Sequence, residues 1–320
     1  METQVYHPRH SVKIVTATSL FDGHDAAINI MRRILQDSGA EVIHIGHNRS
    51  VKEVVDAAIE EDAQGIAVSS YQGGHIEYFK YMVDLLKEQD AGHIKIFGGG
   101  GGVIIPAEIN ELHAYGVARI YSPEDGSAMG LQGMINDMLK TMDQPGVDYT
   151  SLDADQLNTE NKRMVARFIS AAQEAGASDP DEFDRIMARI AGCDPKPGVP
   201  VIGLTGTGGA GKSSLTDELV MRILMDLPQV NLAIISCDPS RRKTGGALLG
   251  DRIRMNSIET GRVYMRSLAT RRSQTELPEA LAPAIEIAKA AGYGMVIVET
   301  AGIGQEDSRV VDLVDLSVYV

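Results

Sequence analysis

Gly206-Thr207-Gly208-Gly209-Ala210-Gly211-Lys212-Ser213 determines how the second half of this chain folds. The stretch has the pattern G-x-x-x-x-G-K-S. It lies between an apolar run, residues 199–204, and a segment with apolar residues at helical spacing, residues 215–223. Glycines in such a turn let the backbone amides point into one concavity at the positive end of the helix. The pattern in this context predicts a phosphate-binding loop rather than a plain glycine-rich turn.

The side chains that end this loop suit a nucleoside triphosphate. Lys212 is expected to reach the β and γ phosphates, and the Ser213 hydroxyl to hold Mg²⁺. The loop residues predicted to bind the nucleotide are Gly206, Gly208, Gly209, Ala210, Gly211, Lys212, Ser213 and Ser214.

Composition limits the possible partners. The 320 residues carry a formal net charge of -14, which argues against duplex DNA, RNA or an anionic membrane as the main partner. The two cysteines, Cys193 and Cys237, are far apart and indicate neither a disulfide framework nor a zinc site. The N-terminus lacks a signal-peptide core, and no run reaches the about 18 apolar residues of a membrane span. We therefore expect a cytoplasmic protein of two domains.

The first 143 residues alternate between strand and helix patterns. Strands are predicted over residues 12–17, 41–45, 65–69, 94–97 and 119–121, each followed by a segment with helical spacing. This alternation predicts a flavodoxin-like α/β domain with a five-stranded, doubly wound parallel sheet.

The rest of the chain divides into two parts. Residues 144–197 are predicted to be a polar linker followed by helices over 160–175 and 180–191, and residues 198–320 a phosphate-loop α/β domain. Residues 241–254 are predicted to be a mobile loop. Strands are also predicted over residues 232–236, 295–298 and 314–320. The last of them leaves the second sheet incomplete, so we expect a piece of a longer protein.

Unusual loops follow three strands of the first domain, where ligands bind in open α/β sheets. The first carries D-G-H-D at residues 22–25, the second S-S-Y-Q-G-G-H at 69–75, and the third five glycines at 98–102. A lone loop histidine is usually just solvated. Here, however, Asp22 can accept the ring proton of His24 and make the other nitrogen a better metal ligand. A receiver-type domain with tight turns is the alternative, although its acidic Mg²⁺ cluster is not evident.

These three motifs resemble those of the cobalamin-binding domains of acyl-CoA mutases, D-x-H-x-x-G, S-x-L and G-G. Ala27 replaces the last glycine of the first motif, and Tyr71 replaces the leucine of the second. The resemblance implies that His24 is the lower cobalt ligand with Asp22 as its partner, and that Ser69 and the glycines line a slot for the displaced nucleotide tail. The implied cofactor-binding residues are Asp22, Gly23, His24, Asp25, Ser69, Tyr71, Gly73, Gly98, Gly99 and Gly100.

Three further motifs follow the phosphate loop: D-P-S at residues 238–240, G-D-R-I-R-M at 250–255 and E-T-A-G-I-G-Q at 299–305. Together with the loop they resemble the G-protein chaperones of cobalamin mutases. The guanine-reading loop is absent from this sequence, so GTP as the nucleotide is implied by the resemblance alone. Gln305 is implied to orient water. The implied Mg²⁺ ligands are Ser213, Asp238, Asp251, Glu299 and Thr300; Arg254 and Gly302 are implied to contact phosphate, and Lys212, Ser213 and Glu299 to act in catalysis.

A cobalamin domain followed by such a G protein is similar to the fused isobutyryl-CoA mutases. That resemblance implies adenosylcobalamin, a mutase barrel later in the same longer chain, an acyl-CoA substrate, an adenosyltransferase that delivers the cofactor, and a homodimer. The implied reaction is the radical interconversion of isobutyryl-CoA and n-butyryl-CoA, with GTP hydrolysis gating cofactor loading. This part alone is expected to show at most GTPase activity.

Two other classes of function remain open. One is a stand-alone cobalamin carrier and GTPase chaperone that acts on a separate mutase. The other is a different phosphate-loop enzyme, such as a kinase or metallochaperone, attached to a receiver-like domain.

Overall fold

The chain folds into two compact units, and each unit is built from segments that are not contiguous in the sequence. The computed structural model describes residues 3–193, 198–240, 244–249, 251–270, 279–300 and 310–320, without the side chains of Pro239, Asp251 and Thr270. The first unit contains Met1–Ile59, Ala63–Pro145 and Arg241–Ile253, and the second contains Glu60–Asp62, Gly146–Ser240 and Arg254–Val320. Each unit therefore takes in a short segment from the half of the sequence that forms the other.

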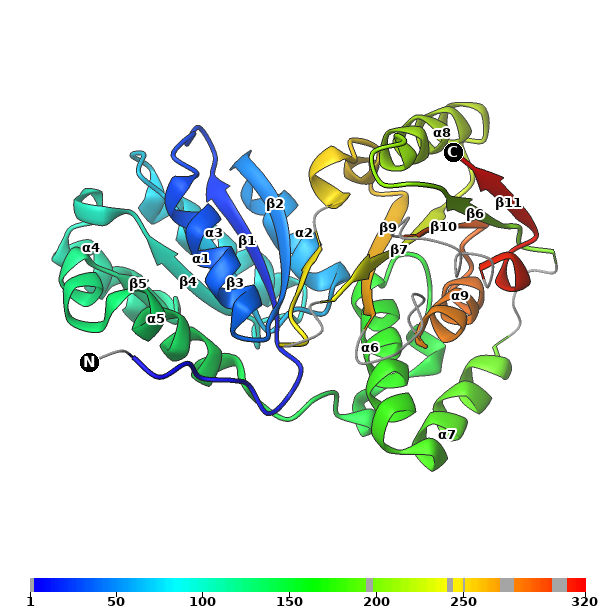
Figure 1. The fold of residues 1–320 in the computed structure, drawn as a ribbon, viewed down its shortest axis with the longest axis horizontal. Coiled ribbons are helices and arrows are strands. Elements are labelled where there is room, and N and C mark those ends of the chain that lie inside the picture. The colour runs from blue at the N-terminus through cyan, green and yellow to red at the C-terminus, as the bar shows by residue number, and fades with distance from the viewer. Residues whose placement is uncertain (1–2, 194–197, 241–243, 250, 271–278, 301–309) are drawn as a thin grey trace. The chain divides into compact units, whose positions relative to one another are not determined.

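A six-stranded parallel sheet forms the centre of the first unit (Figure 1), with strand order β5-β4-β3-β1-β2-β8. Its strands are β1 (Lys13–Ser19), β2 (Glu41–Arg49), β3 (Gly65–Ser69), β4 (Lys95–Gly99), β5 (Arg119–Tyr121) and β8 (Ala247–Leu249). Its helices are α1 (Ala26–Asp37), α2 (Val51–Glu60), α3 (His75–Glu88), α4 (Pro106–Tyr115) and α5 (Pro123–Met142). All five predicted strands are present in the doubly wound order 2-1-3-4-5, which confirms the fold class.

Helices cover both faces of this sheet, which explains why every residue of β1 is buried. Phe97 of β4 shares a core with Leu35 of α1 and Leu139 of α5. A Cβ atom on the next residue, Gly98, would instead meet Phe79 of α3. Because successive strand residues point to opposite faces, α5 and α3 lie on opposite sides of the sheet. The ends of the strands are surrounded by the connecting loops, not by the helices.

β8 was not expected from the sequence. The prediction of a loop over residues 241–254 is wrong for the described part, because β8 pairs in parallel with β2, with Ala247 opposite Glu41. The close approach requires Gly246, where a Cβ would lie 2.0 Å from the carbonyl oxygen of Gln36. A segment between two motifs of the predicted G protein thus forms the edge of the first sheet.

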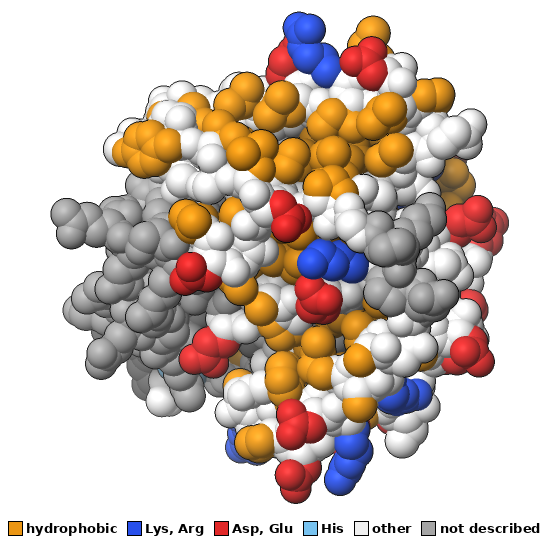
Figure 2. All heavy atoms as spheres, turned by 90° about the vertical axis from the view of Figure 1, so that its right-hand side faces the viewer, with side chains coloured by type: hydrophobic (Ala, Val, Ile, Leu, Met, Phe, Trp, Pro, Cys, Tyr) orange, Lys and Arg blue, Asp and Glu red, His pale blue; other side chains and the backbone are white. Residues whose placement is uncertain are grey.

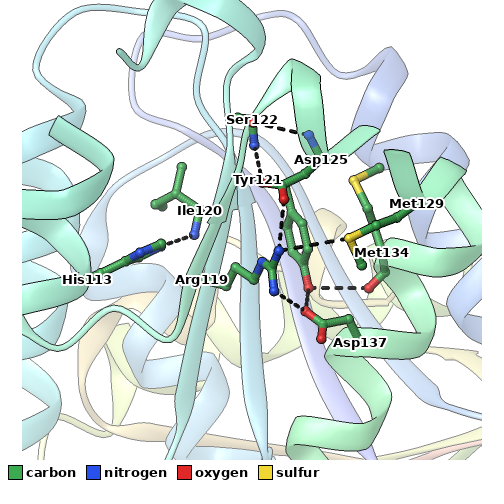
Figure 3. Close-up of polar contacts among 9 residues, drawn as sticks. All are labelled: His113, Arg119, Ile120, Tyr121, Ser122, Asp125, Met129, Met134 and Asp137. Atoms are coloured by element: carbon green, nitrogen blue, oxygen red, sulfur yellow. Dashed lines mark hydrogen bonds and ion pairs between the residues drawn. The ribbon is translucent and has the colours of Figure 1, made fainter. Parts of the chain in front are cut away.

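Polar contacts attach α5 to the opposite edge of the sheet (Figure 3). Arg119 of β5 lies 2.8 Å from Asp125 and 3.3 Å from Asp137, and the Tyr121 hydroxyl donates to Asp137 at 2.8 Å. Ser122 and Asp125 cap the helix reciprocally through side chain and backbone. This capping explains why α5 begins directly after Ser122, at Pro123.

The second unit begins with a helical layer. Residues 144–161 are more than the predicted linker, since they include two short 3₁₀ helices, Tyr149–Ser151 and Ala154–Gln156. Leu152 and Leu157 from this segment are buried in the core of the unit. The helices α6 (Lys162–Ser178) and α7 (Pro180–Ala191) follow as predicted, and Asp179 caps α7 through the amide of Glu182.

A five-stranded parallel sheet follows, with strand order β11-β6-β10-β7-β9. Its strands are β6 (Val201–Thr205), β7 (Leu232–Pro239), β9 (Val263–Thr270), β10 (Met295–Glu299) and β11 (Leu316–Tyr319), with helices α8 (Lys212–Asp226) and α9 (Leu281–Ala290). Short 3₁₀ helices occupy Asp251–Arg254 and Ser257–Thr260. The sequence indicated β6, β7, β10 and β11, but not β9 or α9.

Residues 60–62 explain why β9 can carry polar residues inside the second unit. Arg266 of β9 is fully buried, and it donates to the carbonyl oxygen of Glu60 at 3.4 Å and to the Ser170 hydroxyl at 2.8 Å. Both carboxylate oxygens of the buried Glu61 accept the amide of Ser267 at 3.1 Å. A buried charge is tolerated only when it is paired and hydrogen-bonded, so this strand depends on residues distant in sequence.

β11 lies at one edge of the second sheet and pairs with β6 in the part of the chain that the structure describes. Figure 2 looks onto the side where β11 lies and shows hydrophobic side chains gathered on the surface. On β11 itself, Leu316 and Tyr319 are 56% and 75% exposed. An edge strand with apolar side chains is a surface to which a further strand can add. Among the described helices, none is both long and apolar enough to cross a membrane.

Candidate functional site

The loop after β1 holds a histidine in a defined orientation. Asp22 is fully buried, and its Oδ1 accepts the His24 amide and lies 2.8 Å from the ring atom Nδ1. Burial alone would raise the pKa of Asp22. Hydrogen bonds from the amides of Tyr71 and His24 and from the His24 ring outweigh it, so the pKa lies below its ordinary value. An ionised Asp22 makes Nδ1 the donor and leaves the lone pair of Nε2 on a side chain that is 68% exposed.

Tyr71 joins the second loop to this histidine. Its amide donates to Asp22 Oδ2 at 2.5 Å, so one carboxylate connects the loops after β1 and β3. The ring centroids of Tyr71 and His24 lie 5.7 Å apart at an interplanar angle of 49°. Sequence reasoning included both residues but missed this bridge, since an amide contact across 49 residues leaves no pattern in the sequence.

The glycines predicted to line a slot have two different surroundings. A Cβ at Gly98 would lie 2.5 Å from Phe79, and one at Gly100 would lie 2.0 Å from the carbonyl oxygen of Ser70. Close internal packing therefore accounts for these two glycines by itself. Gly23 and Gly73, in contrast, have no atom within 4 Å of such a Cβ and border open space.

Ser69 contributes a buried hydroxyl that forms no hydrogen bond with the described residues. It is the last residue of β3 and is 7% exposed, and its hydroxyl has no hydrogen-bond partner in the described part of the chain. Buried polar groups are nearly always hydrogen-bonded, so an exception calls for a partner such as a ligand. An exposed histidine nitrogen, open space and an unsatisfied hydroxyl together fit a metal-containing ligand with a polar tail.

The predicted phosphate loop connects β6 to α8. Gly206, Gly209 and Gly211 have φ angles of 138°, 82° and 97°, which side-chain-bearing residues rarely adopt. Helix α8 begins at Lys212, whose Nζ donates to the carbonyl oxygens of Gly206 and Thr207 at 3.0 Å each. The loop therefore has the backbone geometry of a phosphate cradle, and its lysine is held by the loop itself.

Ser213 and Glu299, two of the predicted magnesium ligands, contact each other directly. The Ser213 hydroxyl donates to Glu299 Oε1 at 2.5 Å, and Glu299, at the end of β10, is 3% exposed. Thr216 was missed: its Oγ1 lies 3.1 Å from Glu299 Oε2 and 3.0 Å from the carbonyl oxygen of Lys212. Its position three residues after Ser213 on one helix face could have revealed it.

Two further predicted magnesium ligands, Thr300 and Asp238, lie at or near the ends of β10 and β7. Thr300 directs its hydroxyl to Thr205 Oγ1 at 3.1 Å, and Asp238 lies near the end of the neighbouring strand β7. The Asp251 side chain, Gly302 and Gln305 lie outside the described residues, and Arg254 ends a 3₁₀ helix on the surface. Among the described residues, no three His, Cys, Asp or Glu side chains gather as a metal site. Mg²⁺ bound with a nucleotide usually takes only one or two carboxylates and keeps several waters.

Two known protein families match separate parts of the chain, one at each of the two sites. Residues 12–131 match the B12 binding domain, and residues 165–320 match the methylmalonyl Co-A mutase-associated GTPase MeaB. The chain therefore combines a cobalamin-binding domain with a MeaB-type GTPase domain.

Curated relatives match the chain over nearly its whole length. The chain is 59% identical to a fused isobutyryl-CoA mutase of Geobacillus kaustophilus over 99% of its length, and 58% identical to one of Cupriavidus metallidurans over 98%. A putative GTPase of Pyrococcus horikoshii is 37% identical over 52% of this chain and 50% of its own length. Nearly the whole chain is therefore similar to part of the fused isobutyryl-CoA mutases. It spans 29% and 28% of the length of the first two relatives.

Proposed function

We propose that the first unit binds adenosylcobalamin with His24 Nε2 as the lower cobalt ligand. The observation that carries this proposal is the buried carboxylate of Asp22, which holds Nδ1 and leaves Nε2 exposed. Gly23, Asp25, Ser69, Tyr71, Gly73 and Gly98 to Gly100 would surround the nucleotide tail. When bound, the cofactor supplies radical chemistry by homolysis of its cobalt–carbon bond.

The second unit is proposed to bind and hydrolyse GTP with Mg²⁺. Lys212 would leave its loop carbonyls to neutralise phosphate charge, and Ser213 and Glu299 would hold the metal directly or through water. Asp238, Asp251 and Thr300 complete the proposed metal surroundings, and Arg254 and Gly302 the phosphate contacts. The proposed domain boundaries are residues 1–143, 144–197 and 198–320.

The reaction of the whole protein is the interconversion of isobutyryl-CoA and n-butyryl-CoA, in the cytoplasm. We propose that it takes place on a mutase barrel, in the part of the relatives that this chain does not span. A homodimer and an adenosyltransferase as cofactor donor complete the proposal. The support is the name and the identity of the relatives.

GTP is proposed to gate cofactor loading through the segment that ends at Ile253. This residue lies inside the G-D-R-I-R-M motif, yet it packs in the first unit, 3.1 Å from where a Cβ of Gly46 would lie. Gly46, Asn48 and Ile253 line one pocket of about 320 Å³. A change in this motif on nucleotide binding would therefore reach the end of β2 directly.

Electron paramagnetic resonance of the chain with cob(II)alamin and nitrogen-15 histidine tests the cobalt ligand. We expect a histidine-dependent superhyperfine pattern in the wild type that is lost in His24→Ala. Retained benzimidazole coupling in a bound complex would remove His24 from the cobalt. Absence of corrinoid binding by a folded chain would favour the receiver-like alternative.

Nucleotide choice is tested separately by hydrolysis assays with GTP and competing ATP. We expect GTP to be hydrolysed and ATP to compete poorly. A preference for ATP would overturn the assignment of GTP without affecting the cobalt site.

A further inference from the structure

Phe21 has a backbone conformation that its side chain does not favour. Its φ angle is 64°, in the left-handed region, and it directly precedes Asp22. Bulky residues seldom adopt this region, where glycine and asparagine are favoured. The Phe21 side chain is also 79% exposed. A strained backbone that presents an aromatic ring to solvent is the kind of feature that persists at functional sites.

The hydrogen bonds that hold this conformation do not involve the Phe21 side chain. The Phe21 amide donates to Asn48 Oδ1 at 2.7 Å, and Asn48 has a left-handed φ of 58° itself. The Asn48 amide donates to Thr18 Oγ1 at 3.1 Å, and that hydroxyl donates to the carbonyl oxygen of Asp22 at 2.9 Å. The loop would therefore keep its shape with glycine or asparagine at position 21. The fold does not explain the aromatic ring.

Other apolar side chains are exposed on the loops at this edge of the first unit. Leu20 precedes Phe21, and Val103 and Ile105 follow the glycine run after β4; all three are at least 38% exposed. Together with Phe21 they place apolar surface on the loops next to the His24 imidazole. Phe21 lies three residues before His24, so their Cα atoms are at most about 11 Å apart.

We propose that the Phe21 side chain packs against the corrin ring of the cobalamin that His24 holds. The inference rests on the proposed cobalamin binding and adds a residue that fixes the macrocycle. A corrin centred on a metal above His24 extends sideways over its loop, and its ring is broad and largely apolar. The left-handed backbone then presents the phenyl ring to this ligand, and contact removes its exposed apolar area from water.

Binding of cob(II)alamin by four forms of this chain tests the contact. Phe21→Asn removes the ring and suits the left-handed backbone, and Phe21→Tyr keeps the ring. Tyr81→Asn is the matched control, since Tyr81 is an aromatic residue of α3 that is 53% exposed. We expect Phe21→Asn to weaken binding about tenfold, which corresponds to about 1.4 kcal/mol. Phe21→Tyr and Tyr81→Asn should stay within about twofold of wild type.

Two further readouts separate a contact from a structural role. The unfolding temperature of Phe21→Asn without cofactor should equal or exceed that of wild type, because the strain is relieved. Its bound complex should keep the histidine coupling to cobalt. Unchanged affinity in Phe21→Asn would overturn the inference and leave the ring to another occupant, such as a mutase domain, while His24 coupling in wild type would still support cobalamin binding. Loss of the histidine coupling in this variant would also overturn it.

Discussion

The loop of His24 and the phosphate loop both require residues with left-handed φ angles, but they use different residues for them. Three glycines provide the left-handed turns of the phosphate loop, whereas Phe21 and Asn48 adopt them at the His24 loop and are held by side-chain hydrogen bonds. The functional groups differ as well. His24 is already oriented by Asp22, but the amine of Lys212 is bonded to carbonyl oxygens of its own loop. If the two loops act as proposed, the cofactor side is preorganised, and the nucleotide side would have to exchange contacts when phosphate binds.

The substitution with the largest expected effect is in the phosphate loop. Lys212→Ala should lower GTP hydrolysis at least about 100-fold, because one charged donor to the transferred phosphate is lost. Cobalamin affinity without nucleotide should not change. Steady-state hydrolysis and corrinoid titration measure the two effects, with Lys289→Ala as a control on a surface lysine that pairs with Glu286. Hydrolysis within about tenfold of wild type would mean that Lys212 does not act on phosphate.

Asp22→Asn tests the preorganised side and should have the next largest effect. An amide cannot accept hydrogen bonds with both of its terminal atoms, so either the Tyr71 amide or the His24 ring loses its acceptor. Loss of such a partner of a metal-binding histidine lowers metal affinity about 10–100-fold. Cob(II)alamin titration measures this loss, and Asp56→Asn, at a half-buried aspartate of α2 that pairs with Lys52, is the control. Equal affinity in Asp22→Asn would show that the orientation of His24 is set elsewhere.

The same carboxylate gives a pH dependence with a definite sign. The pKa of Asp22 is lower in the folded chain than in the unfolded chain, so its stabilising effect is complete above the ordinary pKa of an aspartate and is lost as the pH falls through the lowered value. The difference in unfolding free energy between wild type and Asp22→Asn should therefore shrink below about pH 4. Denaturant unfolding at several pH values measures it. A difference that grows on acidification would contradict the lowered pKa.

The two regions also differ in how much the sequence reveals. The spacing of glycines, lysine and serine is local, so the phosphate loop and the Ser213–Glu299 contact could be expected from motifs alone. Asp22 and His24 are local too, but the bridge to Tyr71 depends on the sheet order. Strong local patterns therefore predicted the fold class and pointed to residue pairs that the structure brings into contact, Asp22 with His24 and Ser213 with Glu299.

Contacts between distant segments explain what could not be predicted. β9 was missed because Arg266 interrupts its apolar pattern, and the residues that satisfy this arginine include Glu60, about 200 positions earlier. β8 was assigned to a loop because its three residues form a strand only against β2. In both cases the partner strand or carbonyl decides the structure, and neither leaves a periodic signal in the sequence.

The smallest expected effect concerns the segment that carries β8. Gly246→Ala places a Cβ against the carbonyl oxygens of Gln36 and Ala40, at 2.0 and 2.9 Å, so β8 should separate from β2 without unfolding the unit. Hydrogen exchange at the Ala247 amide, which donates to Ala40, should become at least about tenfold faster. In wild type, a GTP analogue should change the affinity for cobalamin if this segment connects the two sites. In Gly246→Ala that change should be about two- to fivefold smaller. The affinity for cobalamin alone and the affinity for the analogue alone should stay as in wild type.

Gly126→Ala is the matched control for this change, since a Cβ there meets no atom within 4 Å. It should leave both the exchange rate and the nucleotide effect as in wild type. Faster exchange in Gly246→Ala with an unchanged nucleotide effect would show that the preorganised cofactor loop and the phosphate loop communicate by another route. Unchanged exchange would mean that β8 is not held against β2 in solution. Either result would remove the support for a route from the GTPase motif through Ile253 to the end of β2.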